Sequence, residues 1–114
     1  QSSVEEVSNL LESLDAIKKN IRRQFKQLTD QEFLVYAKIY QLEESKEHEI
    51  IDYSLLATTL NLTESSIRDY IVRLLKKGIP LEKTKVNNKK VHISISQNLK
   101  KIATLSTIMT LRDI

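Results

Sequence analysis

Apolar residues recur at heptad spacing through the first 28 residues of the chain, and this pattern predicts one long amphipathic helix. One core position of the heptad is occupied by Val4, Leu11 and Phe25, and the other by Val7, Leu14, Ile21 and Leu28. Leu10 and Ile17 widen the apolar stripe. Lys18 interrupts one of the two series. We expect a coiled-coil helix that forms a homodimer, and the alternative is a helix that packs only on its own domain.

The next stretch of the chain alternates helical patterns with short polar segments. Thr29 and Glu32 have the spacing of a capping box, and a broad apolar face follows them as far as Leu42. After an acidic segment, the β-branched residues 50–53 indicate a short edge strand. Residues 54–62 then predict a short helix that ends in a turn.

Residues 63–77 predict a second helix directly after that turn, with Thr63 as its N-cap. Gly78 follows its last turn, where a left-handed residue is favoured, and Pro80 prevents the helix from resuming. The residues at helical spacing that we expect to face the core are Ile67, Tyr70, Ile71, Leu74 and Leu75. The opposite face shows Glu64, Ser65, Arg68, Asp69 and Arg73.

The remaining sequence predicts a β-hairpin and a last helix. Residues 81–86 and 91–96 alternate apolar and polar side chains on either side of a basic Asn-Asn-Lys-Lys segment. Residues 97–114 carry one apolar face and are expected to form a single amphipathic helix. With only one Gly and one Pro in the chain, helices must dominate.

The order of these elements predicts a mainly α fold with a small β-hairpin, arranged as a winged helix-turn-helix. We expect residues 1–28 to be an N-terminal dimerisation helix and residues 29–96 to be the winged helix-turn-helix domain. Residues 97–114 are expected to form a C-terminal helix that contributes to the dimer interface. The chain begins with glutamine, so we expect it to be a fragment of a longer protein with further domains or partners.

Charge is distributed unevenly along the sequence. Residues 29–62 have a balance of −5, whereas residues 63–114 have a balance of +7. A basic second half of this kind suits a polyanionic partner. The chain has no cysteine and no apolar run of roughly 20 residues, so we expect an intracellular, cytoplasmic protein associated with the nucleoid.

The segments LTDQEFLVYAKIY, DYSLLATTLNLTESSIRDYIVRLLKKGIP and KVNNKKVHISIS resemble the winged-helix domains of MarR-like transcription regulators, particularly the small archaeal predicted regulators. The likeness covers residues 28–96. It implies a homodimer that binds double-stranded DNA, with the helix after the turn in the major groove and the hairpin along the backbone. By position, the base-reading part is matched by Ser65, Ser66, Arg68 and Asp69, and the wing by Lys83, Lys85, Asn87, Asn88, Lys89 and Lys90. The single C-terminal helix departs from the family, which usually has two.

The chemistry of these residues also favours DNA. Small hydroxyl side chains allow the start of a helix to approach a duplex closely, where its free N–H groups attract phosphate. Arg68 can donate two hydrogen bonds to a guanine edge, and Asp69 could accept from cytosine or hold Arg68 in place. Arg73 lies on the same outward face. RNA is a weaker alternative because the basic half lacks aromatic residues for stacking on bases.

The sequence contains no recognisable constellation for catalysis, so we expect no enzyme, cofactor or metal site. His48 and His92 have no Ser or Asp at the spacing of a nucleophile or a metal site. The principal alternative to DNA binding is a winged helix that serves as a protein interaction module in a larger complex. Exposed apolar residues on the second helix of the motif would favour that alternative.

Overall fold

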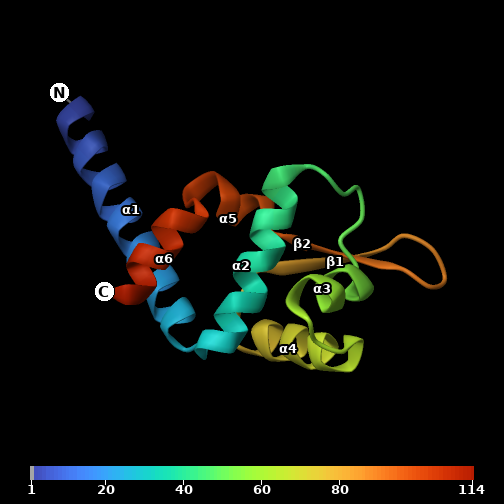
Figure 1. Ribbon diagram of the computed structural model, residues 1–114. Coiled ribbons are helices and arrows are strands. Elements are labelled where there is room, and N and C mark those ends of the chain that lie inside the picture. The colour runs from blue at the N-terminus through green and yellow to red at the C-terminus, as the bar shows by residue number, and fades with distance from the viewer. Residues whose placement is uncertain (1) are drawn as a thin grey trace.

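The computed structural model describes residues 2–114 of the chain, with side chains from Ser3 onward. Within that part the fold is mainly α with one β-hairpin, as the sequence predicts (Figure 1). The elements in order are α1 (Ser2–Lys26), α2 (Asp30–Ser45), α3 (Tyr53–Leu60), α4 (Glu64–Lys76), β1 (Leu81–Lys85), β2 (Val91–Ile95), α5 (Gln97–Ile102) and α6 (Leu105–Asp113). None of the described helices is long and apolar enough to cross a bilayer.

Helices α2, α3 and α4 pack together and the hairpin closes one side of them, which is the arrangement of a winged helix-turn-helix (Figure 1). The two strands are antiparallel, with Leu81 opposite Ile95 and Lys85 opposite Val91. Ile93 and Ile95 are fully buried, so the alternation of β2 points its apolar side chains into the core. We refer to β1, β2 and the connecting residues 86–90 as the wing.

Local hydrogen bonds fix the helix ends where the sequence predicts them. The backbone N–H of Thr29 donates to the Glu32 carboxylate at 2.9 Å, and the N–H of Glu32 donates to the Thr29 hydroxyl at 3.1 Å, which completes the capping box. At the end of α4, Gly78 has φ +83°, and the N–H of Ile79 donates to the carbonyl of Leu74 at 3.0 Å. This is a Schellman motif, and it turns the chain sharply toward β1.

Helix α1 is divided between two environments. Its C-terminal half enters the core through Ile21 and Phe25, and the ring of Phe25 meets that of Tyr36 at 4.8 Å between centroids. Its N-terminal half projects from the body, so the molecule measures 57 Å along its longest axis (Figure 1). The exposed apolar side chains of the projecting half are Val4, Val7, Leu10, Leu11 and Leu14.

The prediction of a single helix over residues 97–114 is wrong, because the segment forms two helices, α5 and α6. Ala103 adopts an extended conformation between them, with φ −144° and ψ 134°. The Tyr40 hydroxyl donates to the carbonyl of Ala103 at 3.2 Å, and the hydroxyl of Thr104 accepts from the N–H of Thr107 at 3.2 Å, so both sides of the break are satisfied. Two C-terminal helices remove the departure from the MarR-like pattern.

The prediction of an edge strand at residues 50–53 is also wrong, since the sheet of the described residues has two strands. Ile51 makes one backbone bond to β2, in which the N–H of Ile93 donates to its carbonyl at 2.8 Å. Its own N–H instead donates to Nδ1 of His92 at 2.9 Å. The side chain of His92 therefore takes the place of the second backbone hydrogen bond that a strand would make with β2. His92 has a structural role.

Candidate nucleic-acid interface

Helix α4 is anchored by one face and presents the other to solvent. Ile67, Ile71 and Leu74 are completely buried beneath it. One expectation for its inner face is corrected, because Leu75 is 37% exposed, whereas Tyr70 is half-buried and packs against the core. All five residues predicted to face outward are exposed, namely Glu64, Ser65, Arg68, Asp69 and Arg73.

The first turn of α4 is held by its cap. The hydroxyl of Thr63 accepts from the N–H of Ser66 at 3.0 Å and donates to the hydroxyl oxygen of Ser66 at 2.9 Å. Ser66 is half-buried in this arrangement, whereas Ser65 is exposed. Of the two serines predicted to approach a duplex, Ser65 projects freely and Ser66 is committed to the cap.

Arg68 is restrained by groups on two helices. Its Nη2 atom lies 3.5 Å from Oε1 of Glu64, one turn earlier in α4, and its guanidinium lies 5.0 Å from the ring centroid of Tyr53 on α3. The acidic partner is thus Glu64 rather than Asp69. Arg73 has a comparable aromatic contact with Tyr70, at 5.2 Å from the ring centroid.

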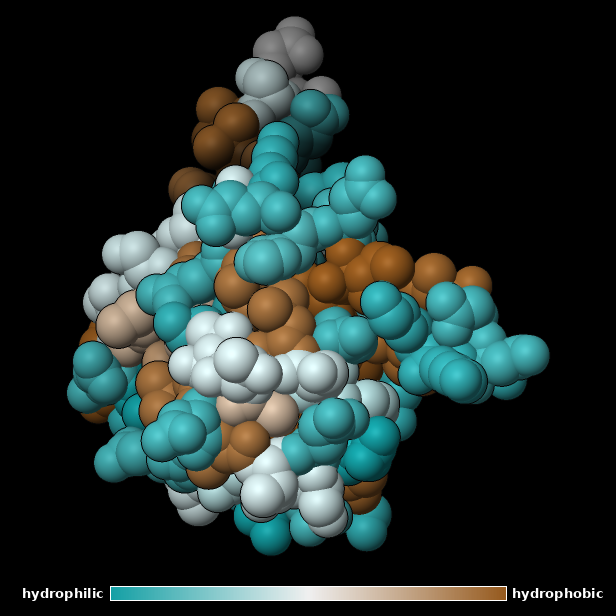
Figure 2. Space-filling view, turned by 45° about the vertical axis from the view of Figure 1, so that its right-hand side comes forward, coloured by the Kyte–Doolittle hydropathy of each residue, from teal (hydrophilic) through white to brown (hydrophobic). Residues whose placement is uncertain are grey.

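The wing carries the basic residues predicted for it, and all of them are exposed: Lys83, Lys85, Asn87, Asn88, Lys89 and Lys90. Figure 2 shows the tip of the wing as a hydrophilic protrusion. The side-chain carbonyl of Asn87 accepts from the N–H of Lys89 at 2.8 Å and from the N–H of Lys90 at 3.0 Å. Asn87 therefore shapes the turn that presents the two lysines.

A hollow of about 200 Å³ joins the wing to the helix-turn-helix, and we call it the wing notch. It is lined by Asp52, Tyr53, Ser54, Glu64, Arg68, Lys89, Lys90 and Val91. The fold thus brings Arg68 of α4 into the same hollow as two lysines of the wing. The two lysines of this concave surface, although partly offset by the carboxylates of Asp52 and Glu64, can hold a backbone phosphate beside Arg68.

The position of α4 depends on an ion pair that the sequence did not reveal. Nζ of Lys77 lies 2.6 Å from Oε1 of Glu32 and donates to the carbonyl of Gln27 at 3.1 Å. Burial raises the pKa of Glu32, but the bonds from Lys77 and from the Thr29 N–H, with the charges of Lys77 and Arg73, outweigh burial and lower the pKa. Lys77 joins the C-terminus of α4 to α2 and to the turn after α1.

Two other long-range ties hold the C-terminal segment. Arg112 donates to the carbonyl of Leu28 at 2.9 Å and to Asp30 at 3.0 Å, and its guanidinium lies 4.8 Å from the ring centroid of Phe33. Lys100 of α5 pairs with Glu43 of α2 at 2.7 Å. No signal in the sequence identifies these partners, because each belongs to a distant element.

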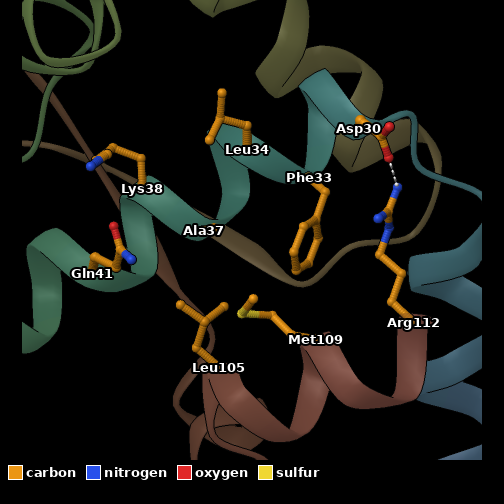
Figure 3. A pocket seen from close by; sticks show the side chains of 9 residues that line it. All are labelled: Asp30, Phe33, Leu34, Ala37, Lys38, Gln41, Leu105, Met109 and Arg112. Atoms are coloured by element: carbon orange, nitrogen blue, oxygen red, sulfur yellow. Dashed lines mark hydrogen bonds and ion pairs between the residues drawn. The ribbon is translucent and has the colours of Figure 1, made fainter. Parts of the chain in front are cut away.

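A second hollow, of about 340 Å³, lies between α2 and α6 and is separate from the wing notch (Figure 3). The side chains of Phe33, Leu105 and Met109 point into it, and the pair of Asp30 and Arg112 closes one end. Its lining is mostly apolar. It shares no residue with the surface formed by α4 and the wing.

No protein family model matches the sequence, and no curated protein matches it significantly. Solved structures, in contrast, match the chain in fold. A crystal structure of MarR has a TM-score of 0.56 and 18% sequence identity, covering 94% of this chain and 75% of that one. A crystal structure of RV1404 from Mycobacterium tuberculosis has a TM-score of 0.54 and 14% identity, covering 99% and 76% of the two chains. The chain therefore has the winged-helix fold seen in MarR.

Proposed function

We propose that the protein is a sequence-specific transcription regulator that binds double-stranded DNA as a homodimer. In this proposal α4 enters the major groove, and the wing lies along the backbone. The observation that carries it is the wing notch, where Arg68 on the outward face of α4 meets Lys89 and Lys90 of the wing. One continuous basic surface then spans a groove and the phosphates beside it.

The residues on this surface divide into two chemical roles. Ser65, Arg68, Asp69 and Arg73 project from α4 toward the base edges. Lys83, Lys85, Lys89 and Lys90 of the wing hold phosphates, with Asn87 and Asn88 forming the tip between them. Ser66 contributes through the cap, which fixes the first turn of α4.

The homodimer is proposed from the projecting half of α1. Leu14 is 41% exposed and the four apolar residues before it are more exposed still. Figure 2 shows hydrophobic side chains at this projecting end of the molecule. A stripe of this kind costs about 25 cal/mol for each Å² of apolar surface left in water, and the same stripe on a second copy would cover it.

DNA binding and the two roles can be tested with matched variants. The protein is first used to select duplexes from a randomised library, and affinities are then measured by fluorescence anisotropy for the recovered duplex and for a shuffled one. Arg68→Ala should cost about 1–3 kcal/mol on the recovered duplex and little on the shuffled duplex. Equal losses on both duplexes would show that Arg68 does not read bases.

Replacing both Lys89 and Lys90 with alanine should weaken binding to both duplexes alike, because phosphates are the same in every sequence. The slope of log affinity against log salt should become shallower by roughly 0.9 for each phosphate that the variant no longer neutralises. Glu82→Ala is a control on the same hairpin, because it removes an acidic side chain and leaves every basic residue of the wing in place. A double variant with an unchanged salt slope would remove the wing from the interface.

Protein binding is the second candidate for this surface, and one observation favours it. Val72 and Leu75 are 42% and 37% exposed on α4, which is more apolar surface than a DNA-reading helix requires. If the library yields no preferred duplex and the native protein shows no salt-dependent affinity, the winged helix serves a protein partner. Replacing Val72 with Asp should then abolish binding to that protein partner.

A further inference from the structure

The wing notch contains an aromatic side chain that the DNA-binding pattern does not explain. Tyr53 is the first residue of α3, and the guanidinium of Arg68 lies 5.0 Å from the centroid of its ring. A guanidinium at this distance from an aromatic ring is attracted by the negative charge of the ring face. Tyr53 therefore contacts one of the two arginines of α4 that are expected to approach the base edges.

The ring belongs to a part of the fold that is fixed in place. Asp52 caps α3 by accepting from the N–H of Leu55 at 2.8 Å, and Leu56 is completely buried one turn further on. The turn into α4 is closed by Asn61 in the left-handed conformation, with φ 56°. The backbone of Tyr53 is thus held in place relative to α4, which keeps its ring within reach of Arg68.

The other restraint on Arg68 is weak. The ion pair with Glu64 is long, at 3.5 Å, and the side chains of Arg68 and Glu64 are 56% and 49% exposed. An exposed pair of this kind contributes little, because water weakens the attraction and two long side chains must be ordered to form it. An exposed cation–π contact is at least comparable in strength with an exposed ion pair, so the ring of Tyr53 is a substantial restraint on the conformations of Arg68.

We propose that Tyr53 is a positioning residue that holds Arg68 in the conformation needed to read a base, and that it thereby sets sequence specificity. This rests on the proposed DNA-binding function. A long side chain that is ordered before binding loses less freedom when the complex forms. The benefit appears only on the correct duplex, where Arg68 meets its base, and backbone binding does not depend on it.

The test compares three variants by the ratio of affinities for the recovered and the shuffled duplexes. Tyr53→Leu should lower this ratio about two- to five-fold, which is the range expected for an exposed cation–π contact. Tyr53→Phe keeps the ring and should retain the native ratio, and Glu64→Gln should change it by less than about two-fold. The salt slope should stay native in all three, because each variant keeps every lysine that meets a phosphate.

A double-mutant cycle with Arg68→Ala separates positioning from a structural role. If Tyr53 acts through Arg68, then Tyr53→Leu should have no further effect on the ratio in the Arg68→Ala background. A drop of the same size in both backgrounds would overturn the inference. If the native protein and the Tyr53→Leu variant discriminate equally well between the two duplexes, the inference is overturned but the proposed function is left intact.

A measurement without DNA tests the same contact independently. In the free native protein, nuclear Overhauser effects should join the Tyr53 ring protons to the Arg68 side chain, and the Nε proton of Arg68 should shift upfield. Both signals should persist in Tyr53→Phe and disappear in Tyr53→Leu. Their absence from the native protein would overturn the inference, whereas a library that yields no preferred duplex would overturn the proposed function.

Discussion

The ion pair between Lys77 and Glu32 offers a sharp test of how α4 is held. The Glu32 side chain is 3% exposed and that of Lys77 is 31% exposed, with 2.6 Å between the charged atoms. Lys77→Met keeps the length of the aliphatic stem and removes the charge. The carboxylate of Glu32 is then left buried with the N–H of Thr29, at 2.9 Å, as its remaining hydrogen-bond donor.

The size of the effect follows from this geometry. Breaking a fully buried pair costs about 3–5 kcal/mol, but Lys77 is partly in contact with water, so we expect a loss of about 2 kcal/mol. A domain of 114 residues gains roughly 2.1 cal/mol/K of unfolding entropy for each residue. The loss should therefore lower the melting temperature by roughly 8 °C, measured by circular dichroism at a fixed protein concentration.

Glu32→Gln provides the matched control. Glutamine can still accept from the N–H of Thr29 and keep the capping box, but it leaves no buried charge. In the Glu32→Gln background, Lys77→Met should cost less than about 1 kcal/mol, so the double-mutant cycle should show strong coupling. A Lys77→Met protein that melts within roughly 2 °C of the native protein would refute this account, as would additive effects of the two substitutions.

The same pair predicts a pH dependence. The pKa of Glu32 is lower in the folded protein than its ordinary value, so its contribution to stability is complete at neutral pH and declines as the pH falls through the folded-state pKa. Lys77→Met removes the bond and the charge that lower this pKa and leaves the burial that raises it. The difference in melting temperature between the native and Lys77→Met proteins should therefore narrow as the pH is lowered from neutral into the acid range where Glu32 becomes protonated.

Three further substitutions test other parts of the structure. Leu14→Asp places a charge in the exposed stripe of α1 and should convert the proposed dimer to a monomer, as measured by sedimentation equilibrium. A native protein that is monomeric at tens of micromolar would contradict the proposed dimer. Arg112→Ala removes the donors to the carbonyls of Phe25 and Leu28 and should lower the free energy of unfolding, measured by urea denaturation, by about 1–3 kcal/mol. The control Lys101→Ala, at an exposed position, should leave the free energy of unfolding unchanged. Thr63→Ala should cost about 1 kcal/mol and speed amide hydrogen exchange in the first turn of α4, whereas Thr63→Ser should not.

The outward face of the candidate site was predictable because it depends on helical periodicity. Ile67, Ile71 and Leu74 identify the buried side of α4 from spacing alone, which leaves Arg68 and Arg73 outside. The exposure of the wing lysines does not follow from strand alternation, because Lys83 and Lys85 fall on the same face of β1 as the buried Leu81 and the other two lysines lie in the connecting turn. The exposure of Leu75, near the end of α4, depended on where the packing against α2 and α3 stops.

The sequence by itself determined the features that depend on neighbouring residues. The capping box of α2, the cap at Thr63 and the left-handed Gly78 each join groups within a few residues of one another. These features therefore depend on the local sequence and not on contacts with distant elements. Because those signals mark helix ends and the apolar periods mark buried faces, the order of elements and the winged helix-turn-helix could be predicted before any long-range contact was known.

Tertiary structure decided everything that joins distant elements. The contact of Tyr53 with Arg68, the pair of Lys77 with Glu32 and the break at Ala103 beside Tyr40 all arise where two elements pack side by side. The same packing drew half of α1 into the core and left the other half exposed, although the heptad pattern runs through both. Local periodicity states which residues share a face, but only the packed fold determines what that face meets.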